Sequence, residues 1–363
     1  MKKLKLTKVI ASTLIAASVL ALNPIGANAE WRQDAKGWWY TEGRSWAEGF
    51  RVIDGSLYYF DSKGYMAHGK PNDFGDKVGL NDNGQFTNVT IHGAWAFCEQ
   101  TGEIVAYLGS DSNVAIPDKI DNVVVKGIGS KAFYQCNSLK NITIPTSVTC
   151  IGECAFYGCM NLTSINIPAS VKFIKEKAFT GCSSLTNISV DNDSTNYKSI
   201  DGVLYSKDGT NILCYPAAKS DKNYTIPNSV IIIGSNAFSR CTKLTSIVIP
   251  NSVKTIGYRA FEGCTGLTEI KIPDSVTSIV NSAFIDCSNL TSINIPNGLT
   301  TIESSIFSGC TNLINVTIPN SVTSMGMCSF GGCKNTSFYV KSEAVKKLLT
   351  KSGINASKIV LTA

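Results

Sequence analysis

The stretch Leu162-Thr163-Ser164-Ile165-Asn166-Ile167-Pro168-Ala169-Ser170-Val171 decides the fold, because recognisable copies of it recur from about residue 139 to residue 322. The apolar run of each copy ends at a proline, and these prolines are Pro145, Pro168, Pro227, Pro250, Pro273, Pro296 and Pro319. Neighbouring prolines are 23 residues apart except for Pro168 and Pro227, whose spacing of 59 is one period plus 36 inserted residues. A fixed period of this length predicts a solenoid built from stacked copies of one small unit.

Within one copy the side chains alternate as they do in a β-strand. Leu162, Ile165 and Ile167 fall on one side of the extended run, whereas Ser164 and Asn166 fall on the other side and should face solvent. Proline lacks an N–H donor and ends each strand. The Ile-Gly that follows turns the chain toward a short Ala-Phe-x-x-Cys segment, for which we expect one helical or 3₁₀ turn. A single copy cannot bury its own apolar face, so the copies must stack.

The full repeat, Val-Thr-x-Ile-Gly-x-x-Ala-Phe-x-x-Cys-x-x-Leu, resembles the motif of the BspA-like leucine-rich repeat surface proteins over roughly residues 100–340. The resemblance implies a leucine-rich repeat solenoid with a parallel β-sheet on its concave face and short helical or 3₁₀ turns outside. It also implies an adhesin that binds host or neighbouring-cell protein or glycan ligands. The alternative hypothesis is a structural cell-surface component that self-associates and has no heterologous ligand.

Residues 1–29 have the composition of a secretory signal peptide. Four lysines precede the apolar run 9–22, and Ala27-Asn28-Ala29 supplies a small-x-small cleavage signal. The run is shorter than the roughly 20 residues of a membrane span, so we expect cleavage rather than an uncleaved anchor helix, and no membrane span afterwards. Removing the four lysines lowers the formal net charge from +6 to about +2, which gives nucleic-acid binding little electrostatic support. We therefore expect a secreted protein of the cell wall or cell surface.

Residues 30–70 form a different module, which is rich in aromatic residues and Asp-Gly or Lys-Gly turns and predicts β-hairpins. The stretch 31–69 resembles the cell-wall-binding, choline-binding-type repeat, in which aromatic rings cage a quaternary ammonium group. The resemblance implies these wall-binding aromatics: Trp38, Trp39, Trp46, Tyr58, Tyr59 and Tyr65. Phe50 and Leu57 stand where the family usually has caging tryptophans, which makes choline doubtful and leaves another bacterial cell-wall polymer as the partner. The competing interpretation is that these aromatics only fill a small hairpin core.

The remaining segments flank or interrupt the array. Residues 71–94 begin with a polar, turn-rich stretch that indicates a linker. The solenoid is expected over 95–341, starting with an N-terminal cap. The 36-residue insertion within 191–226 has two alternating runs around an Asp-Gly turn, which predict a β-hairpin that either elaborates one face or forms a lip beside a binding surface. Residues 342–363 have helical spacing after a serine and predict a C-terminal cap.

Eight of the 13 cysteines follow the repeat phenylalanine by three residues. They are Cys136, Cys159, Cys182, Cys241, Cys264, Cys287, Cys310 and Cys333. We expect one core column of buried free thiols, since their side chains should point in parallel rather than toward one another. Cys150 and Cys154 form the only pair that suggests a metal or redox site, but no histidine lies near them and zinc usually needs four ligands. No metal site is therefore predicted.

Nothing in the sequence indicates an enzyme or a cofactor. The only histidines are His68 and His92, and neither accompanies a nucleophile motif. No glycine-rich phosphate loop is present, and the carboxylates are scattered over turns without a pair suited to glycoside hydrolysis.

The strand positions that face away from the core form two columns of mostly uncharged hydrogen-bonding residues. The candidate ligand-binding residues from these columns are Asn141, Thr143, Ser164, Asn166, Ser246, Val248, Glu269, Lys271, Ser292 and Asn294. Such a surface suits a protein strand or a glycan better than a charged polymer. Glu269 and Lys271, the only charged residues in the columns, mark the expected specificity spot. The competing interpretation is that Ser, Thr and Asn only keep the face soluble.

Overall fold

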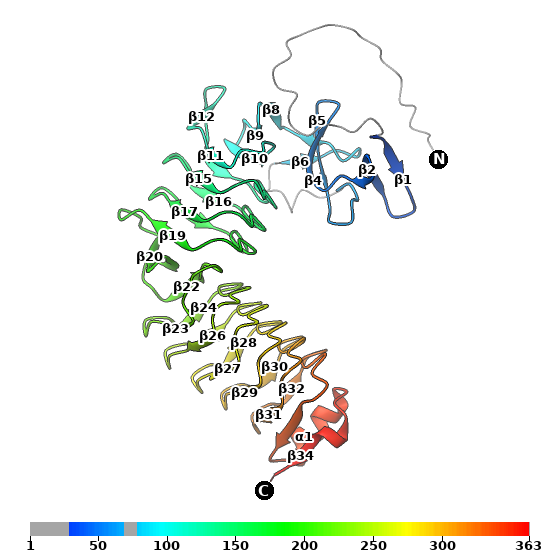
Figure 1. The fold of residues 1–363 in the computed structure, drawn as a ribbon, viewed down its shortest axis with the longest axis vertical. Coiled ribbons are helices and arrows are strands. Elements are labelled where there is room, and N and C mark those ends of the chain that lie inside the picture. Colours follow the sequence, from blue (N-terminus) through cyan, green and yellow to red (C-terminus); the bar gives the residue numbers. More distant parts are fainter. Residues whose placement is uncertain (1–28, 69–77, 363) are drawn as a thin grey trace.

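A computed structural model describes residues 29–68 and 78–362, and a bowed stack of coils runs through most of them (Figure 1). The expected signal peptide, residues 1–29, lies outside the described residues except for Ala29. Small β-hairpins precede the coils, and an α-helix follows them. The predicted leucine-rich repeat solenoid, with its parallel strands and its small N-terminal hairpin module, is confirmed.

The Ile-x-Ile stretch of each coil forms a parallel sheet, termed here the first face. Its strands are β11 (Asn113–Ala115), β15 (Asn141–Thr143), β17 (Ser164–Ile167), β19 (Asn187–Val190), β23 (Asn223–Thr225), β25 (Ser246–Val248), β27 (Glu269–Ile270), β29 (Ser292–Asn294), β31 (Asn315–Ile318), β33 (Ser337–Val340) and β34 (Ile359–Leu361). Ser164 of β17 pairs with Asn187 of β19, so equivalent residues of successive coils stack in columns as predicted. The ladder stops at the insertion, between β19 and β23, and between β25 and β27 it is reduced to one isolated bridge from Val248 to Lys271.

Each coil also contains a two-residue strand that the sequence did not predict. These strands form a second face: β14 (Gly127–Ile128), β16 (Cys150–Ile151), β18 (Phe173–Ile174), β24 (Ile232–Ile233), β26 (Thr255–Ile256), β28 (Ser278–Ile279), β30 (Thr301–Ile302) and β32 (Ser324–Met325). A glycine follows five of these eight strands, and its missing side chain allows the neighbouring coil to approach closely. A Cβ atom on Gly152 would lie 2.5 Å from the backbone nitrogen of Ser130 in the preceding coil, and one on Gly257 would lie 2.7 Å from that of Ser235.

The outer Ala-Phe-x-x-Cys segments are single tight turns whose backbones also bond from coil to coil. The Phe156 nitrogen donates to the Ala178 oxygen of the next coil at 2.8 Å, and the Cys159 nitrogen closes a three-residue turn on the Phe156 oxygen at 3.2 Å. The Cys159 thiol donates to the Phe133 oxygen of the preceding coil at 3.0 Å. Cysteine therefore fits this column because it is small and apolar and still supplies one weak donor to a buried carbonyl.

The phenylalanines inside the turns form a stacked aromatic column along the core. Phe261 stacks on Phe284 with ring centroids 5.1 Å apart, and Phe284 stacks on Phe307 at 5.5 Å. All three side chains are fully buried. Each coil thus buries its apolar residues mainly against its two neighbours, as expected for a solenoid.

The N-terminal part is a series of hairpins on either side of residues 69–77, which lie outside the described residues, and it joins the solenoid. Its strands are β1 (Trp31–Gln33), β2 (Trp38–Glu42), β3 (Ser45–Trp46), β4 (Gly49–Ile53), β5 (Ser56–Phe60), β6 (Gly79–Leu80), β7 (Phe86–Thr87), β8 (Thr90–His92), β9 (Trp95–Cys98), β10 (Glu103–Tyr107), β12 (Lys119–Ile120) and β13 (Val123–Val124). The described residues 78–94 of the expected linker 71–94 are therefore folded. Val78 and Phe86 share a core with Tyr59 and Ala96. The polar stretch is a hairpin turn, in which the Asn81 side chain accepts the backbone N–H groups of residues 83 and 85.

The insertion and the C-terminus add the last elements. The insertion contains β20 (Tyr197–Ile200), β21 (Val203–Ser206) and β22 (Asn211–Cys214), which form an antiparallel sheet that continues into the parallel strand β24. Helix α1 (Glu343–Lys351) begins at Ser342, whose hydroxyl accepts the Val345 N–H at 3.3 Å, and it buries Val345 and Leu349 against the last coil. A 3₁₀ turn, η2 (Ala356–Lys358), leads into β34. Within residues 29–68 and 78–362, no helix has the length and apolarity needed to cross a membrane.

Candidate functional site

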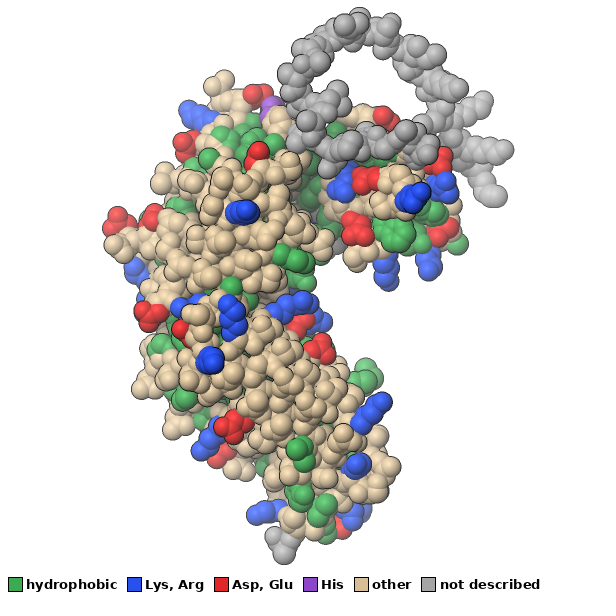
Figure 2. All heavy atoms as spheres, viewed as in Figure 1, with side chains coloured by type: hydrophobic (Ala, Val, Ile, Leu, Met, Phe, Trp, Pro, Cys, Tyr) green, Lys and Arg blue, Asp and Glu red, His purple; other side chains and the backbone are tan. Residues whose placement is uncertain are grey.

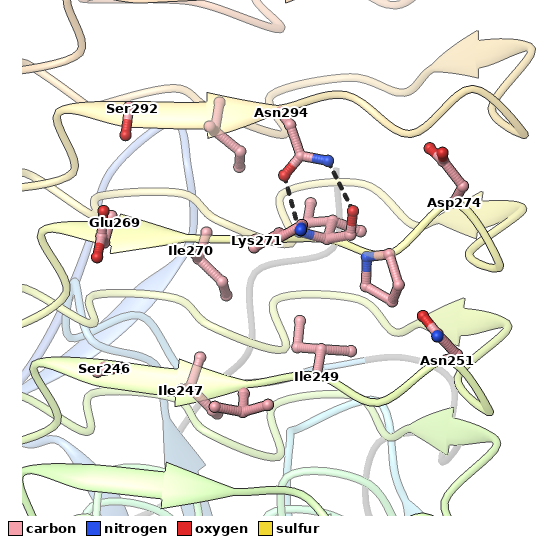
Figure 3. Close-up of a pocket in the computed structure, with 14 residues that line it drawn as sticks. Ser246, Ile247, Ile249, Asn251, Glu269, Ile270, Lys271, Asp274, Ser292 and Asn294 are labelled. Atoms are coloured by element: carbon pink, nitrogen blue, oxygen red, sulfur yellow. Dashed lines mark hydrogen bonds between the residues drawn. The ribbon is translucent and has the colours of Figure 1, made fainter.

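An open hollow of about 890 Å³ lies on the first face over β25, β27 and β29 (Figure 3). Six of the ten residues predicted for a binding surface line it: Ser246, Val248, Glu269, Lys271, Ser292 and Asn294. Asn251 and Asp274 line it as well, from positions just after the closing prolines. The hollow is thus the place where the structure concentrates the predicted residues.

The hollow coincides with a local opening of the sheet. Only the bridge from Val248 to Lys271 connects β25 to β27. On the other side of β27, the Asn294 side chain occupies the place of a backbone partner. Its amide nitrogen donates to the Ile272 oxygen at 2.6 Å and its amide oxygen accepts the Ile272 N–H at 2.9 Å (dashed lines in Figure 3). Asn294 therefore shapes the hollow, and its amide is committed to the backbone rather than available to a ligand.

Three charged side chains give the hollow its electrostatic character. Glu269 is exposed on β27 and Lys271 is exposed directly after it, and neither forms an ion pair with another described residue. Asp274 lies past Pro273, where the Asn297 backbone N–H donates to its carboxylate at 2.9 Å and lowers its pKa. At neutral pH the hollow therefore presents two carboxylates and one ammonium group.

Sequence reasoning missed Asp274 because the residue lies outside the two strand columns. A signal was present nevertheless. Among the seven prolines that close the repeat copies, only Pro273 is followed by an acidic residue, since the equivalent positions are Thr146, Ala169, Asn228, Asn251, Asn297 and Asn320. Outside these copies, Asp118 follows Pro117 at the start of the solenoid.

The other four predicted residues lie on the first face but before the insertion. Asn141 and Thr143 are on β15, and Ser164 and Asn166 are on β17. Two of these side chains bond to residues of the neighbouring coils. The Asn141 amide donates to the Asn113 side chain at 2.7 Å, and the Asn166 amide donates to Asp191 at 2.8 Å. The structure does not bring them to the hollow.

The predicted wall-binding aromatics divide into buried and accessible groups. Tyr58 and Tyr59 are buried, with 8% and 7% of their surface exposed, and the Tyr59 ring lies 6.4 Å from that of Tyr134 in the first coil. Trp38 and Trp46 are exposed by 38% and 50%. Trp39 and Tyr65 are half-buried and meet edge to face at 6.1 Å. Tyr58 and Tyr59 thus serve packing, and the other four remain candidates for contact with a ligand: Trp38, Trp39, Trp46 and Tyr65.

The cysteines show no arrangement suited to metal binding in the described part of the chain, where no cluster of three potential ligands occurs. Cys150 lies on β16 and Cys154 in the following outer turn. Burial raises the pKa of both thiols, which disfavours the thiolate form that a metal requires. All 13 cysteines are free thiols, and the predicted column lies in the core.

His92 takes part in a small polar network at the N-terminal cap. Its Nδ1 atom lies 2.9 Å from the Asp121 carboxylate, and its Nε2 atom lies 2.7 Å from the Thr90 hydroxyl. The same hydroxyl has two further oxygen acceptors, on Glu99 at 3.1 Å and on Phe97 at 3.2 Å. The network ties β8 to the turn between β12 and β13, which is a structural use of the histidine.

The surface seen in Figure 2 carries charged side chains of both signs, scattered among uncharged polar atoms. No basic stripe of the kind used for nucleic-acid binding gathers on that face.

Comparisons with known proteins agree with this geometry. A family model described as the BspA type leucine rich repeat region matches residues 109–206 and 214–337, in six copies. The structure of a leucine-rich repeat protein from Eubacterium ventriosum aligns with a TM-score of 0.53 and 24% identity, covering 80% of this chain and 83% of that one. The pneumococcal vaccine antigen PcpA aligns with a TM-score of 0.55 and 20% identity, covering 87% of this chain and all of that one. At these identities the two structures show a shared fold. No curated protein matches the sequence.

Proposed function

The chain belongs to the BspA-type leucine-rich repeat family, and on that premise we propose that it is a secreted, wall-associated surface protein that binds a protein or glycan ligand in the hollow over β25, β27 and β29. The observation that carries the proposal is the hollow itself. Its volume of about 890 Å³ is in the range of ligand sites, and it brings together Glu269, Lys271 and Asp274 on a face whose other outward strand positions are uncharged.

The shape of the hollow favours an extended ligand. It is open to solvent and spans three parallel strands, so a peptide strand or a glycan chain lying along it contacts several coils at once. Ser246 and Ser292 offer hydroxyl groups, and Val248, which is 53% exposed, offers an apolar contact. Glu269 and Lys271 then select the partner, because charges at an interface chiefly set specificity.

The hollow can be tested by exchanging its charges. We expect Glu269→Arg combined with Lys271→Glu to weaken binding about tenfold or more, because each charged group of the ligand then meets a like charge. The measurement is surface plasmon resonance of the full mature chain on immobilised fibronectin, collagen and mucin glycans.

A matched control exchanges a pair of opposite charges elsewhere. Glu153 and Lys177 form a 3.2 Å ion pair on the outer turns, and Glu153→Lys with Lys177→Glu should leave binding within twofold. Equal binding by the wild type and the Glu269/Lys271 variant would exclude the hollow as the site.

The N-terminal hairpins are proposed to hold the protein on a bacterial cell-wall polymer through Trp38 and Trp46. Removing the whole module would expose Phe86, Ala96 and Val105, which share a core with Leu57 and Tyr59 of the module, so point variants are the cleaner test. We expect Trp38→Ala with Trp46→Ala to lose most of its retention on purified cell walls in a pull-down, while binding to the matrix panel is unchanged. Stacking aromatics contribute much of such binding.

The control for this pull-down is Phe173→Ala, which removes an aromatic side chain that is 63% exposed on the solenoid. It should retain full wall binding. Undiminished retention of the double tryptophan variant would leave these residues with a packing role only.

Self-association is the second candidate, and one observation favours it. Strand β34 lies at the end of its sheet, next to β33 alone, and its residues Val360 and Leu361 are 42% and 45% exposed. Free edges of this kind pair readily with other strands. Concentration-dependent oligomers in sedimentation, without binding to the ligand panel, would favour this function over the first.

A further inference from the structure

The aromatic column of the core is interrupted once, at the insertion. Phe156 stacks on Phe179 at 5.8 Å, and the column resumes with Tyr215 stacked on Phe238 at 5.2 Å. No ring contact joins Phe179 to Tyr215 among the residues that the structure describes. The buried apolar residues likewise form two separate clusters, one before and one after this point. The insertion therefore divides the core and does not merely decorate a surface.

The insertion repeats the topology of the N-terminal cap. In the cap, β8, β9 and β10 are antiparallel and β10 continues into the parallel strand β14. In the insertion, β20, β21 and β22 are antiparallel and β22 continues into the parallel strand β24. The second hairpin closes in both cases on a glycine in the left-handed region, Gly102 at φ 71° and Gly209 at φ 78°.

The side chains that start each core column also correspond. Tyr107 is the last residue of β10 and Tyr215 directly follows β22, and each takes the place of the repeat phenylalanine by stacking on the first phenylalanine of its column. The Tyr107 nitrogen donates to the Ala132 oxygen at 2.8 Å, and the Tyr215 nitrogen donates to the Ala237 oxygen at 2.7 Å.

The hydroxyl groups of these two tyrosines find equivalent partners too. The Tyr107 hydroxyl donates to Asp111 at 2.7 Å, and the Tyr215 hydroxyl donates to Asp221 at 3.0 Å. A tyrosine suits the first position because its ring stacks on the first coil while its hydroxyl reaches a partner outside the column.

Within the described ranges, the outer turn of the coil before the insertion does not donate backbone hydrogen bonds to a following coil, as in the last coil of a stack. In the preceding coil, the nitrogens of Cys154 and Phe156 donate to the next coil at 3.2 and 2.8 Å. The equivalent nitrogens of Lys177 and Phe179 have no backbone acceptor among the described residues. A small hollow of about 120 Å³ lies there, lined by Phe179, Leu213 and Asn236 among others. Coil-to-coil bonding of the outer turns therefore stops at this junction.

Strand β21 lies between the two cores and serves both. Leu204 of β21 belongs to the core before the insertion, whereas its neighbours Val203 and Tyr205 belong to the core after it. Alternate residues of a strand point to opposite sides, so one short sheet closes the first stack and opens the second. The Tyr197 hydroxyl completes the seam by accepting the Ile174 N–H at 2.8 Å.

We infer that the insertion is a second N-terminal cap, so that the chain contains two separately capped repeat units. Unit 1 comprises residues 90–196 and unit 2 comprises residues 197–362. Energetic coupling across the junction is weaker than coupling between neighbouring coils, because both the aromatic column and the outer hydrogen-bond ladder stop there. The hollow over β25, β27 and β29 lies wholly in unit 2. The inference holds whether or not the hollow binds a ligand.

The test measures hydrogen exchange by mass spectrometry on the full mature chain in increasing urea, for Leu162→Ala in unit 1 and Leu267→Ala in unit 2. Both side chains are buried in equivalent positions of their coils. Leu162→Ala should lower the urea midpoint of peptides within 139–190 by about 1 M and leave peptides within 230–320 unchanged. Leu267→Ala should do the reverse.

A milder pair, Ile151→Val and Ile256→Val, covers the case in which an alanine variant does not fold. Equal shifts of both regions by either pair of variants would overturn the inference, because a single cooperative solenoid transmits the loss across the junction. Unequal shifts confined to the mutated unit support it.

Discussion

Phe284→Ala lowers the free energy of unfolding by about 3 to 5 kcal/mol, an effect that we expect to be among the largest of any single substitution in this protein. The Phe284 ring is fully buried and lies between two stacked rings, at 5.1 Å from Phe261 and 5.5 Å from Phe307. Alanine removes the apolar surface of the ring and leaves a cavity that rigid neighbouring coils cannot close. It also removes two stacking contacts, each worth about 0.5 to 1.5 kcal/mol.

The measurement is urea unfolding of the mature chain followed by far-ultraviolet circular dichroism. Phe173→Ala is the control, because this side chain is 63% exposed on the second face and its loss should change stability by no more than about 0.5 kcal/mol. If the two variants were equally stable, the stacked column would not be the main support of the fold.

The aromatic column was predictable because its cause lies in the period of the sequence. A residue that returns every 23 positions must occupy the same place in every coil, so Phe261, Phe284 and Phe307 had to meet. The same argument placed the cysteines in one column. The alternation of side chains along a strand, rather than the period, placed Glu269 and Lys271 on the outward side of one coil.

The second face was not predictable by the same means. A two-residue strand such as Cys150–Ile151 is too short to show alternation, so its existence depends on pairing with the neighbouring coil. The folded hairpin at residues 78–94 was missed for a related reason. Its polar turn resembles a linker in composition, and only the burial of Val78 and Phe86 shows that the segment is part of the core.

The hollow itself depends on one side chain that breaks the pattern of the sheet. Asn294 is identical to Asn166 in its place in the repeat, yet it bonds to the backbone of Ile272 where Asn166 bonds to Asp191. The repeat alone does not distinguish these two outcomes. The structure was therefore needed to locate the candidate site along the array, although the sequence had already predicted six of the residues that line it.

The second large effect is a loss of stability in mild alkali, caused by the thiol column. Burial raises the pKa of the Cys241 and Cys264 thiols well above the ordinary value of 9.0. The pKa of Cys159 and Cys310 is raised first by the neighbouring thiols of Cys182 and Cys287 and then by burial. The folded protein therefore keeps these four protons at pH values where the unfolded chain releases them.

The sign of the effect follows from that difference in bound protons. The contribution of each thiol to stability is fully present below pH 9 and is lost as the pH rises toward its folded-state pKa, because ionisation then favours the unfolded chain. At pH 10 the loss is about 1.4 kcal/mol for each strongly shifted thiol. These four thiols alone account for a decrease of roughly 5 kcal/mol in the free energy of unfolding between pH 8 and pH 10. Cys214 and Cys333 add to this decrease, because burial raises the pKa of each thiol to about 12.

The measurement is urea unfolding at pH 8, 9 and 10 in the presence of a reductant, which keeps the thiols from forming disulfides in the unfolded chain. A matched variant, Cys241→Ala with Cys264→Ala, isolates the cause. It is less stable than the wild type at pH 8, because it loses two thiols that donate to buried carbonyls, at 3.7 Å to Tyr215 and 3.0 Å to Phe238. Its decrease between pH 8 and pH 10 should nevertheless be smaller than that of the wild type by about 3 kcal/mol, because two strongly shifted thiols are absent. An unchanged decrease would assign the alkaline sensitivity to other groups, such as the buried tyrosines, whose ordinary pKa near 10 places their own contribution at higher pH.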